Sequence, residues 1–289
     1  MKKVRIGVIG CGGIGLGKHI HEMLECEDAV ITAICDINPD ALARAKEKIG
    51  TDVACYTDYK DLVADENVDA IEVCTPNNLH AEMAIAALEA GKPVNLEKPI
   101  AMNYDEAMKI IEAEKNSSAF GMTCFTYRFM PAVRYATYLM SQGVIGDVIG
   151  LNATYAKCSA YWEGRRLEWR FVKELAASGV AGDLGVHLVD LAQRLAGNIT
   201  ELCAMTEIVV KERTTLDGSA VAPVETDDNC FFLARFAGGG MGSFHITRAA
   251  IGHKNTIRYD VYGTKGSMTF ELQKPVPDTI ILTDRKSVV

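Results

Sequence analysis

Residues 7–15 read GVIGCGGIG, and this stretch decides the fold of the first part of the chain. It holds the spacing Gly10-x-Gly12-x-x-Gly15 directly after the apolar run KVRIGVIG and before a helical pattern. A second apolar run, VITAICD, ends at Asp36. A strand, a Gly-rich turn, a helix and a second strand that ends in an acid are the context of a dinucleotide-binding βαβ unit.

The three glycines have different predicted tasks. Gly10 permits the tight turn, Gly12 lets backbone N–H groups approach a pyrophosphate, and Gly15 lets the helix lie close to the sheet. Asp36 stands where a carboxylate would accept from a ribose 2′-hydroxyl and repel a 2′-phosphate, so we expect NAD(H) rather than NADP(H). The candidate cofactor residues of this region are Gly10, Gly12, Gly13, Ile14, Gly15, Asp36 and Ile37.

Apolar runs alternate with helical patterns over the first ~120 residues, which predicts a parallel sheet covered on both faces. After residue ~125 the pattern changes to a helix that ends near Gly143, a helix at about 184–196, and strands joined by glycine-bearing turns. The predicted fold class is α/β: an N-terminal Rossmann domain (1–124) with a parallel sheet, and a C-terminal α+β domain (125–289) with a predominantly antiparallel sheet. We expect the second domain to bind substrate and to form oligomer contacts.

Composition narrows the class of protein. The 289 residues carry a formal charge of −8, with 48% hydrophobic and 24% charged residues, as in a soluble globular protein. The acidic balance argues against nucleic-acid binding. Because no apolar run approaches ~18 residues, we expect no membrane span. Nine scattered cysteines without a CxxC pair predict a reducing, cytoplasmic location, with neither a disulfide framework nor a metal site.

Three further segments carry candidate chemistry. The first, CTPNNLH at 74–80, follows the fourth predicted strand; Asn78 is predicted to cap the next helix, and Asn77 either points into the cofactor crevice or belongs only to a well-capped helix. The second, PVNLEKPIA at 93–101, ends a predicted strand with an acid, a base and a proline. Glu97 either accepts from the nicotinamide ribose or fixes Lys98. The residues assigned to the cofactor here are Cys74, Thr75, Pro76, Asn77, His80, Glu97 and Lys98.

The third segment, AGDLGVHLVDLAQRLAG at 181–197, carries leucines at helical spacing beside Asp183 and His187. A carboxylate one turn from an imidazole can orient the ring and favour its protonated form, which suits a general base. From spacing alone, however, a single histidine on such a helix is more often structural.

The motifs GCGGIG, TPNNLH, LEKP and GDLGVHLVD together resemble those of the Gfo/Idh/MocA oxidoreductases, in the order typical of that family. The segments YRFMPAVR, GVIGDVIGLNATYA and YDVYGTKGSM extend the resemblance over nearly the whole chain. Family members commonly continue for tens of residues beyond a strand like TIILTD, so we expect either a short member or a truncated chain.

The resemblance implies a mechanism and its residues. Lys98, Asp183 and His187 match the family's catalytic set, which implies hydride transfer between NAD and a secondary hydroxyl of a sugar, inositol or other polyol. His187 would act as the base, and Lys98 would stabilise the developing charge. The resemblance also suggests a cis bond at Lys98–Pro99. Two alternatives stay open: NAD-dependent, redox-assisted glycoside hydrolysis, and a non-catalytic NAD-binding sensor, against which the retained catalytic set argues.

Substrate-binding candidates outside the catalytic set lie in two places. Tyr127 and Arg128 follow the last Rossmann strand, where Arg128 either grips substrate or forms a surface salt bridge. Trp169 and Arg170 close the aromatic stretch WEGRRLEWR, which either packs against a sugar ring or anchors a loop. An antiparallel sheet with one uncovered face predicts a homodimer or homotetramer.

Overall fold

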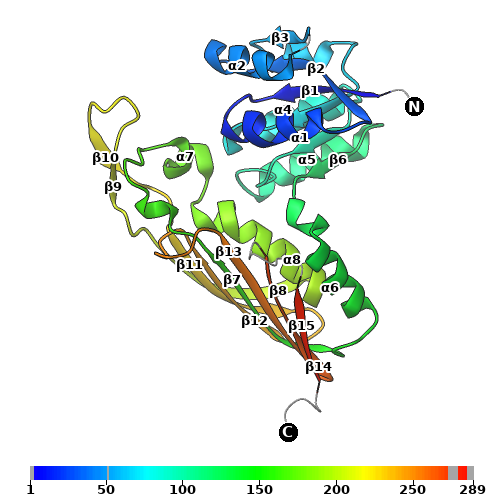
Figure 1. Cartoon of the computed structure of the whole chain (residues 1–289), viewed down its shortest axis with the longest axis vertical. Helices are drawn as coiled ribbons and strands as arrows, with labels where there is room; N and C mark the ends of the chain where they lie inside the picture. The colour runs from blue at the N-terminus through cyan, green and yellow to red at the C-terminus, as the bar shows by residue number, and fades with distance from the viewer. Residues whose placement is uncertain (1–2, 51, 273–278, 285–289) are drawn as a thin grey trace. The chain divides into compact units, whose positions relative to one another are not determined.

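The computed structural model describes residues 3–50, 52–272 and 279–284. The chain divides into two compact units, Met1–Cys124 and Phe125–Val289. Figure 1 shows their elements in chain order, from blue to red.

Unit 1 is built on a six-stranded parallel sheet in the order β3-β2-β1-β4-β5-β6, which is the Rossmann order. The predicted parallel sheet is therefore confirmed. Its strands are β1 (Val4–Ile9), β2 (Ala29–Cys35), β3 (Ala54–Tyr56), β4 (Ala70–Val73), β5 (Val94–Leu96) and β6 (Gly121–Thr123). The helical segments are η1 (Gly15–His19), α1 (Ile20–Leu24), α2 (Pro39–Ile49), α3 (Tyr59–Ala64), η2 (Asn77–Leu79), α4 (His80–Glu89) and α5 (Tyr104–Asn116).

Strand register brings three chain segments to one edge of this sheet. Ile9 of β1 lies opposite Val73 of β4, and Val73 lies opposite Leu96 of β5. The chain therefore leaves three neighbouring strands at the same level. The Gly-rich turn, the segment from Cys74 and the segment from Glu97 all begin at this carboxyl edge, where ligands bind in sheets of this kind.

Local signals set most helix ends in unit 1. Asn38 caps α2 by accepting from the backbone N–H groups of Asp40 and Ala41. Gly91, with φ of +70°, comes just after the C-cap residue of α4, where glycine is common. The predicted cap by Asn78 is wrong: neither η2 nor α4 has a side-chain cap, because Asn78 lies inside the 3₁₀ turn that opens the helix.

Unit 2 contains a seven-stranded sheet in the order β15-β14-β13-β7-β12-β11-β8. Its hairpins β11–β12 and β13–β14 confirm the expected antiparallel pattern. The parallel pairing of β7 with β12 makes the sheet mixed. The strands are β7 (Val148–Ala156), β8 (Ile199–Glu207), β11 (Asn229–Phe236), β12 (Met241–Thr247), β13 (Thr256–Gly263), β14 (Gly266–Leu272) and β15 (Ile280–Asp284), and β9 (Glu212–Thr214) pairs separately with β10 (Val221–Pro223).

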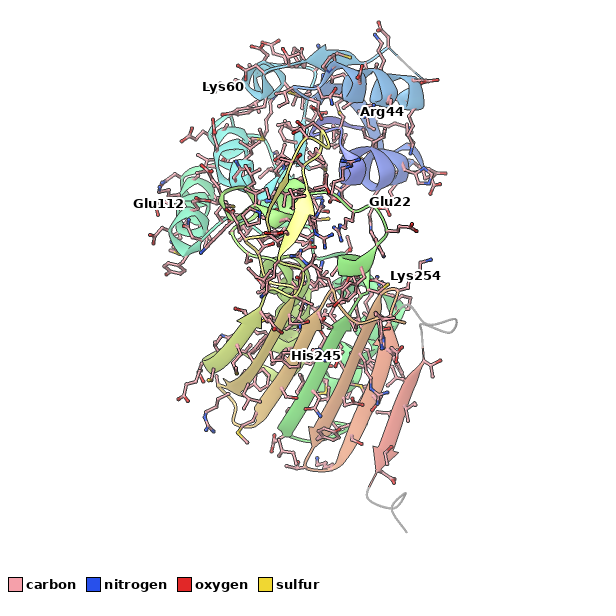
Figure 2. The ribbon with its side chains drawn as sticks, turned by 90° about the vertical axis from the view of Figure 1, so that its left-hand side faces the viewer. Glu22, Arg44, Lys60, Glu112, His245 and Lys254 are labelled. Atoms are coloured by element: carbon pink, nitrogen blue, oxygen red, sulfur yellow. The ribbon has the colours of Figure 1, made fainter. Side chains whose placement is uncertain are left out.

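Helices cover one face of this sheet and leave the other open. Figure 1 shows α6 and α8 on the covered face, and Figure 2 looks onto the open face, where His245 is labelled. The predicted leucine stripe of α8 lies in the core, and Leu188 is fully buried. The helical segments are η3 (Thr126–Phe129), α6 (Pro131–Ser141), η4 (Ser159–Tyr161), η5 (Trp169–Phe171), α7 (Lys173–Ala176), η6 (Ala181–Gly185) and α8 (Val186–Ala196).

One helical stretch, Lys173–Ala196, is long and apolar enough to cross a membrane by length and composition alone. The expectation based on uninterrupted apolar runs did not identify it. Length and composition are weak evidence of a membrane span, because the core helix of a globular domain passes the same test. Leu184, Leu188 and Leu191 of this stretch pack in the core of unit 2.

The Gly-rich turn of unit 1 depends on two backbone approaches. Gly10 has φ of +96°, and a Cβ there would lie 2.7 Å from the carbonyl atoms of Cys74. A Cβ on Gly15 would lie 2.0 Å from the carbonyl oxygen of Gly10. Both positions exclude a side chain, as the Gly10 and Gly15 predictions require.

We predict that Gly15→Ala destabilises unit 1, because a backbone atom would have to move to admit the methyl group. The expected loss is about 1–3 kcal/mol or more in the free energy of unfolding, measured by thermal and urea denaturation. Gly17→Ala is the matched control: it lies in the same helical turn and faces open space, so stability should stay level or rise by up to about 1 kcal/mol. Equal effects of the two substitutions would contradict the packing argument.

Candidate active site

The tip of the Gly-rich turn is uncovered. A Cβ built on Gly12 or Gly13 meets no atom within 4 Å, so the backbone of this turn is open to a ligand. The segment after it differs from the expected regular α-helix, because η1 is a π-helical turn that leads into α1. Ile14 precedes this turn and is partly exposed. The exposed glycine backbone is what close approach of a pyrophosphate requires.

Asp36 lies at the carboxyl end of β2, as predicted. Its Oδ2 accepts from the Cys11 backbone N–H at 2.7 Å, and its Oδ1 accepts from the Asn38 N–H at 2.9 Å. These bonds fix the carboxylate beside the Gly-rich turn, and each oxygen has a further lone pair for a ribose hydroxyl. Ile37 is 88% exposed next to it. The geometry suits the adenosine end of NAD.

The segment after β4 contains one residue whose contacts indicate a role other than the predicted one. His80 is 1% exposed, and its Nδ1 and Nε2 lie 2.7 and 3.0 Å from the carbonyl oxygens of Pro99 and Thr75. Burial lowers the pKa of His80, which the two carbonyl contacts oppose. These contacts fit a residue that ties two loops together, and they leave neither ring nitrogen directed to a cofactor. Asn77 is also buried.

The segment after β5 places Glu97 and Lys98 at the same edge of the sheet. The Lys98–Pro99 peptide bond is cis. Glu97 Oε2 accepts from the Lys98 backbone N–H at 3.0 Å, and Glu97 Oε1 lies 2.8 Å from His19 Nε2. Of the two tasks considered for Glu97, these contacts favour the one in which it fixes Lys98.

In unit 2, Asp183 and His187 lie one turn apart in consecutive helical segments. Asp183 is in the π-helical turn η6, and His187 is in the first turn of α8. The start of η6 is held from outside: Asp227 accepts from the backbone N–H groups of Gly179 and Ala181 at 2.7 and 2.9 Å. Sequence reasoning did not identify Asp227, since its contact crosses more than forty residues. π-Helical turns are frequent at functional sites.

Aromatic rings surround His187. Its ring centroid lies 5.9 Å from that of Phe125, 4.7 Å from that of Tyr127 and 6.3 Å from that of Tyr155. The hydroxyl oxygens of Tyr127 and Tyr155 are 3.1 Å apart. Burial raises the pKa of Tyr155, and Tyr127 raises it further, so the Tyr155 hydroxyl stays neutral near pH 7. Tyr155 is a site neighbour that the sequence did not reveal.

Three of the remaining candidates, Arg128, Trp169 and Arg170, form contacts within unit 2. Arg128 makes a bidentate ion pair with Asp190 of α8, and both Asp190 oxygens lie 2.9 Å from Arg128 Nε. This contact favours the salt-bridge interpretation of Arg128. Arg170 lies over the ring of Trp169, at 4.4 Å from its centroid.

Both units match family models of known proteins. Residues 4–123 match the family model described as "Oxidoreductase family, NAD-binding Rossmann fold", and residues 133–269 match the "GFO/IDH/MocA C-terminal domain". The chain is 34% identical over 253 residues to levoglucosan dehydrogenase of Pseudarthrobacter phenanthrenivorans, which covers 83% of this chain and 65% of that protein.

Two further relatives are similar over nearly the whole chain. Myo-inositol 2-dehydrogenase of Thermotoga maritima is 30% identical over 284 residues, 98% of this chain and 79% of that protein. A solved structure of levoglucosan dehydrogenase in complex with NADH and L-sorbose aligns with a TM-score of 0.89 and 31% identity, over 97% of this chain and 76% of that one. The chain thus spans about two thirds to four fifths of the length of these three matches. The chain belongs to the Gfo/Idh/MocA family of oxidoreductases, with an NAD-binding Rossmann domain.

Proposed function

We propose that this protein transfers a hydride between NAD(H) and a secondary hydroxyl or ketone of a sugar, an inositol or a related polyol. The levoglucosan, myo-inositol and D-apiose dehydrogenases among its relatives support this substrate class. NAD supplies the hydride acceptor when bound, and the chain supplies placement and electrostatics.

One observation within unit 1 carries the proposal. The open Gly12 backbone follows β1 and Lys98 follows β5; β4 lies between these two strands, and all three end at the same edge of the sheet. At that edge the Lys98 ammonium group would lie beside the bound cofactor, where hydride transfer takes place. A domain that only bound NAD would not need a lysine fixed there by an adjacent carboxylate.

Lys98 would bind the reacting oxygen and stabilise negative charge as it develops. His187 would accept the hydroxyl proton, and Asp183, one turn before it, would orient His187 or the substrate. The aromatic rings around His187 limit its rotation, which favours a fixed direction for proton transfer. The sugar would contact Tyr127 and the Trp169–Arg170 pair. Arg128 would not contact the sugar directly, because it is held in the ion pair with Asp190.

We also propose self-association and a cytoplasmic location. The open face of the unit 2 sheet exposes large apolar side chains on the adjacent strands β8, β11 and β12, among them Met205, Phe231, Leu233 and Met241. A patch of this kind is typical of a protein interface, and a second copy of the chain is the partner that every molecule has available. Nine free cysteines fit a reducing compartment.

The first prediction from this proposed function concerns turnover. Lys98→Met and His187→Gln should each lower kcat by about 10²–10⁴-fold, because each removes a group that acts on the reacting oxygen. The NADH dissociation constant, measured by fluorescence, should change little. Lys109→Met, which removes an exposed lysine of α5, is the control and should leave kcat unchanged.

The assay is NADH absorbance with levoglucosan, inositols, aldoses and sugar acids. Wild-type turnover in both site variants would exclude these roles. Release of an aglycone without net NADH would replace the proposal by glycoside hydrolysis, and NAD binding without any turnover would indicate a sensor.

The second prediction concerns cofactor choice. We expect kcat/KM for NAD to exceed that for NADP by about tenfold or more, because the Asp36 carboxylate repels a 2′-phosphate. Asp36→Ser should narrow this ratio. Asp40→Ser, which removes an exposed carboxylate from the first turn of the neighbouring helix α2, is the control. It should leave the ratio of kcat/KM for NAD to kcat/KM for NADP unchanged. Preference of the wild-type protein for NADP would refute the assignment of Asp36.

The third prediction concerns assembly. Light scattering coupled to size exclusion should give a dimer or tetramer for the wild-type chain. Leu233→Lys should lower the mass toward the monomer, because a charge on the open sheet face opposes burial. Tyr104→Lys alters an equally exposed site in unit 1 and should leave the mass unchanged. A monomeric wild type would disprove self-association.

A further inference from the structure

A buried histidine that the mechanism does not use lies between two carboxylates in unit 1. His19 Nδ1 is 2.8 Å from Glu72 Oε1, and His19 Nε2 is 2.8 Å from Glu97 Oε1. The side chains of His19, Glu72 and Glu97 are 6%, 4% and 12% exposed. The three residues come from η1, β4 and the end of β5, so the cluster joins the helix after the Gly-rich turn to the segment that carries Lys98.

Hydrogen-bond chemistry determines the charge of this cluster. A neutral imidazole has one N–H and one lone pair, whereas an ionised carboxylate only accepts. A neutral His19 would therefore point a lone pair at one carboxylate from 2.8 Å. Either the ring carries both protons, or one of the two carboxyl groups carries a proton.

The other contacts of both acids favour their ionised forms. Asn95 Nδ2 donates to both oxygens of Glu72, at 2.9 and 3.0 Å. The Lys98 backbone N–H donates to the second oxygen of Glu97. Burial alone would lower the pKa of His19, but hydrogen bonds with Cys74, Glu72 and Glu97 raise it well above its ordinary value. Although burial opposes the shift, His19 and Lys98 lower the pKa of Glu97.

The distances also distinguish this cluster from a metal site. His19, Glu72 and Cys74 on one side, and His19, Glu97 and Cys124 on the other, have the donor types that bind zinc. Tetrahedral ligands at ~2.0–2.1 Å from an ion would lie about 3.3 Å from one another. The 2.8 Å separations between ring nitrogens and carboxylate oxygens are those of charge-assisted hydrogen bonds.

We propose that His19 is a positioning residue: a permanently charged imidazolium that balances Glu72 and Glu97 and so holds Glu97 against the backbone of Lys98. The inference rests on the proposed role of Lys98 in turnover. Removing the charge leaves two buried carboxylates facing each other, and one of them must move or take up a proton. In either case the hydrogen bond that fixes the start of the Lys98–Pro99 segment weakens.

The first measurement uses the wild-type chain with ¹⁵N-labelled histidine. The His19 ring signals, identified by their loss in His19→Gln, should show both N–H groups up to about pH 9. A His19 that titrates near the ordinary value of about 6.5 would overturn the proposal. This readout does not depend on activity and remains informative if the substitution impairs folding, because Glu72→Gln then identifies the same signals by their shift.

The second measurement tests the charge balance by kinetics. His19→Gln should lower kcat by about tenfold or more with little change in the NADH dissociation constant, at a temperature well below the unfolding midpoint of every variant. The double variant His19→Gln/Glu72→Gln should recover part of this loss, because it removes one of the two unbalanced carboxylates. His21→Gln, two residues along and exposed, is the matched control and should behave as wild type.

The outcomes separate this proposal from the proposed function. Wild-type kcat in His19→Gln, or a loss that the double variant does not relieve, overturns the positioning role even where Lys98→Met abolishes turnover. Wild-type turnover in Lys98→Met instead removes the role of Lys98 itself, whatever the protonation state of His19.

Discussion

The close approach of a helix to the end of β1 is the constraint on which unit 1 depends. A single methyl group on Gly15 would overlap the carbonyl oxygen of Gly10, so the helix can start here only if that side chain is absent. This start fixes the position of η1 and brings His19 to the ends of β4 and β5. The turn that leaves its backbone open at Gly12 therefore also determines, through Gly15, where His19 lies relative to Lys98.

The two units hold their functional side chains by different physical means. Around Lys98 the interactions are ionic and directional, with carboxylates, an imidazole and backbone N–H groups at hydrogen-bond distance. Around His187 the rings of Phe125, Tyr127 and Tyr155 pack against the imidazole and restrict its rotation.

Sequence patterns predicted the features that depend on short separations. The glycine spacing, Asp36 and the leucine stripe of α8 each depend on residues within one or two elements. The sequence did not predict contacts between residues that are far apart along the chain. His19 meets Glu97 across 78 residues, and the only sequence signal was an acid, Glu72, inside an apolar strand. The π-helical turns also escaped prediction, because they arise where packing from elsewhere, such as the contacts of Asp227, overrides regular helical spacing.

The parallel pairing of β7 with β12 has a consequence for how the chain reaches this fold during synthesis. Asn152 of β7 bonds to Ser243 of β12 across 91 residues, and β7 has no neighbour in the sheet other than β12 and β13. At about 5–20 residues per second, a ribosome needs roughly 5–20 s to deliver those partners. Throughout that interval the central strand of unit 2 carries two unpaired edges. The burden on the cell's chaperones therefore falls on the middle of the chain, after unit 1 has emerged complete.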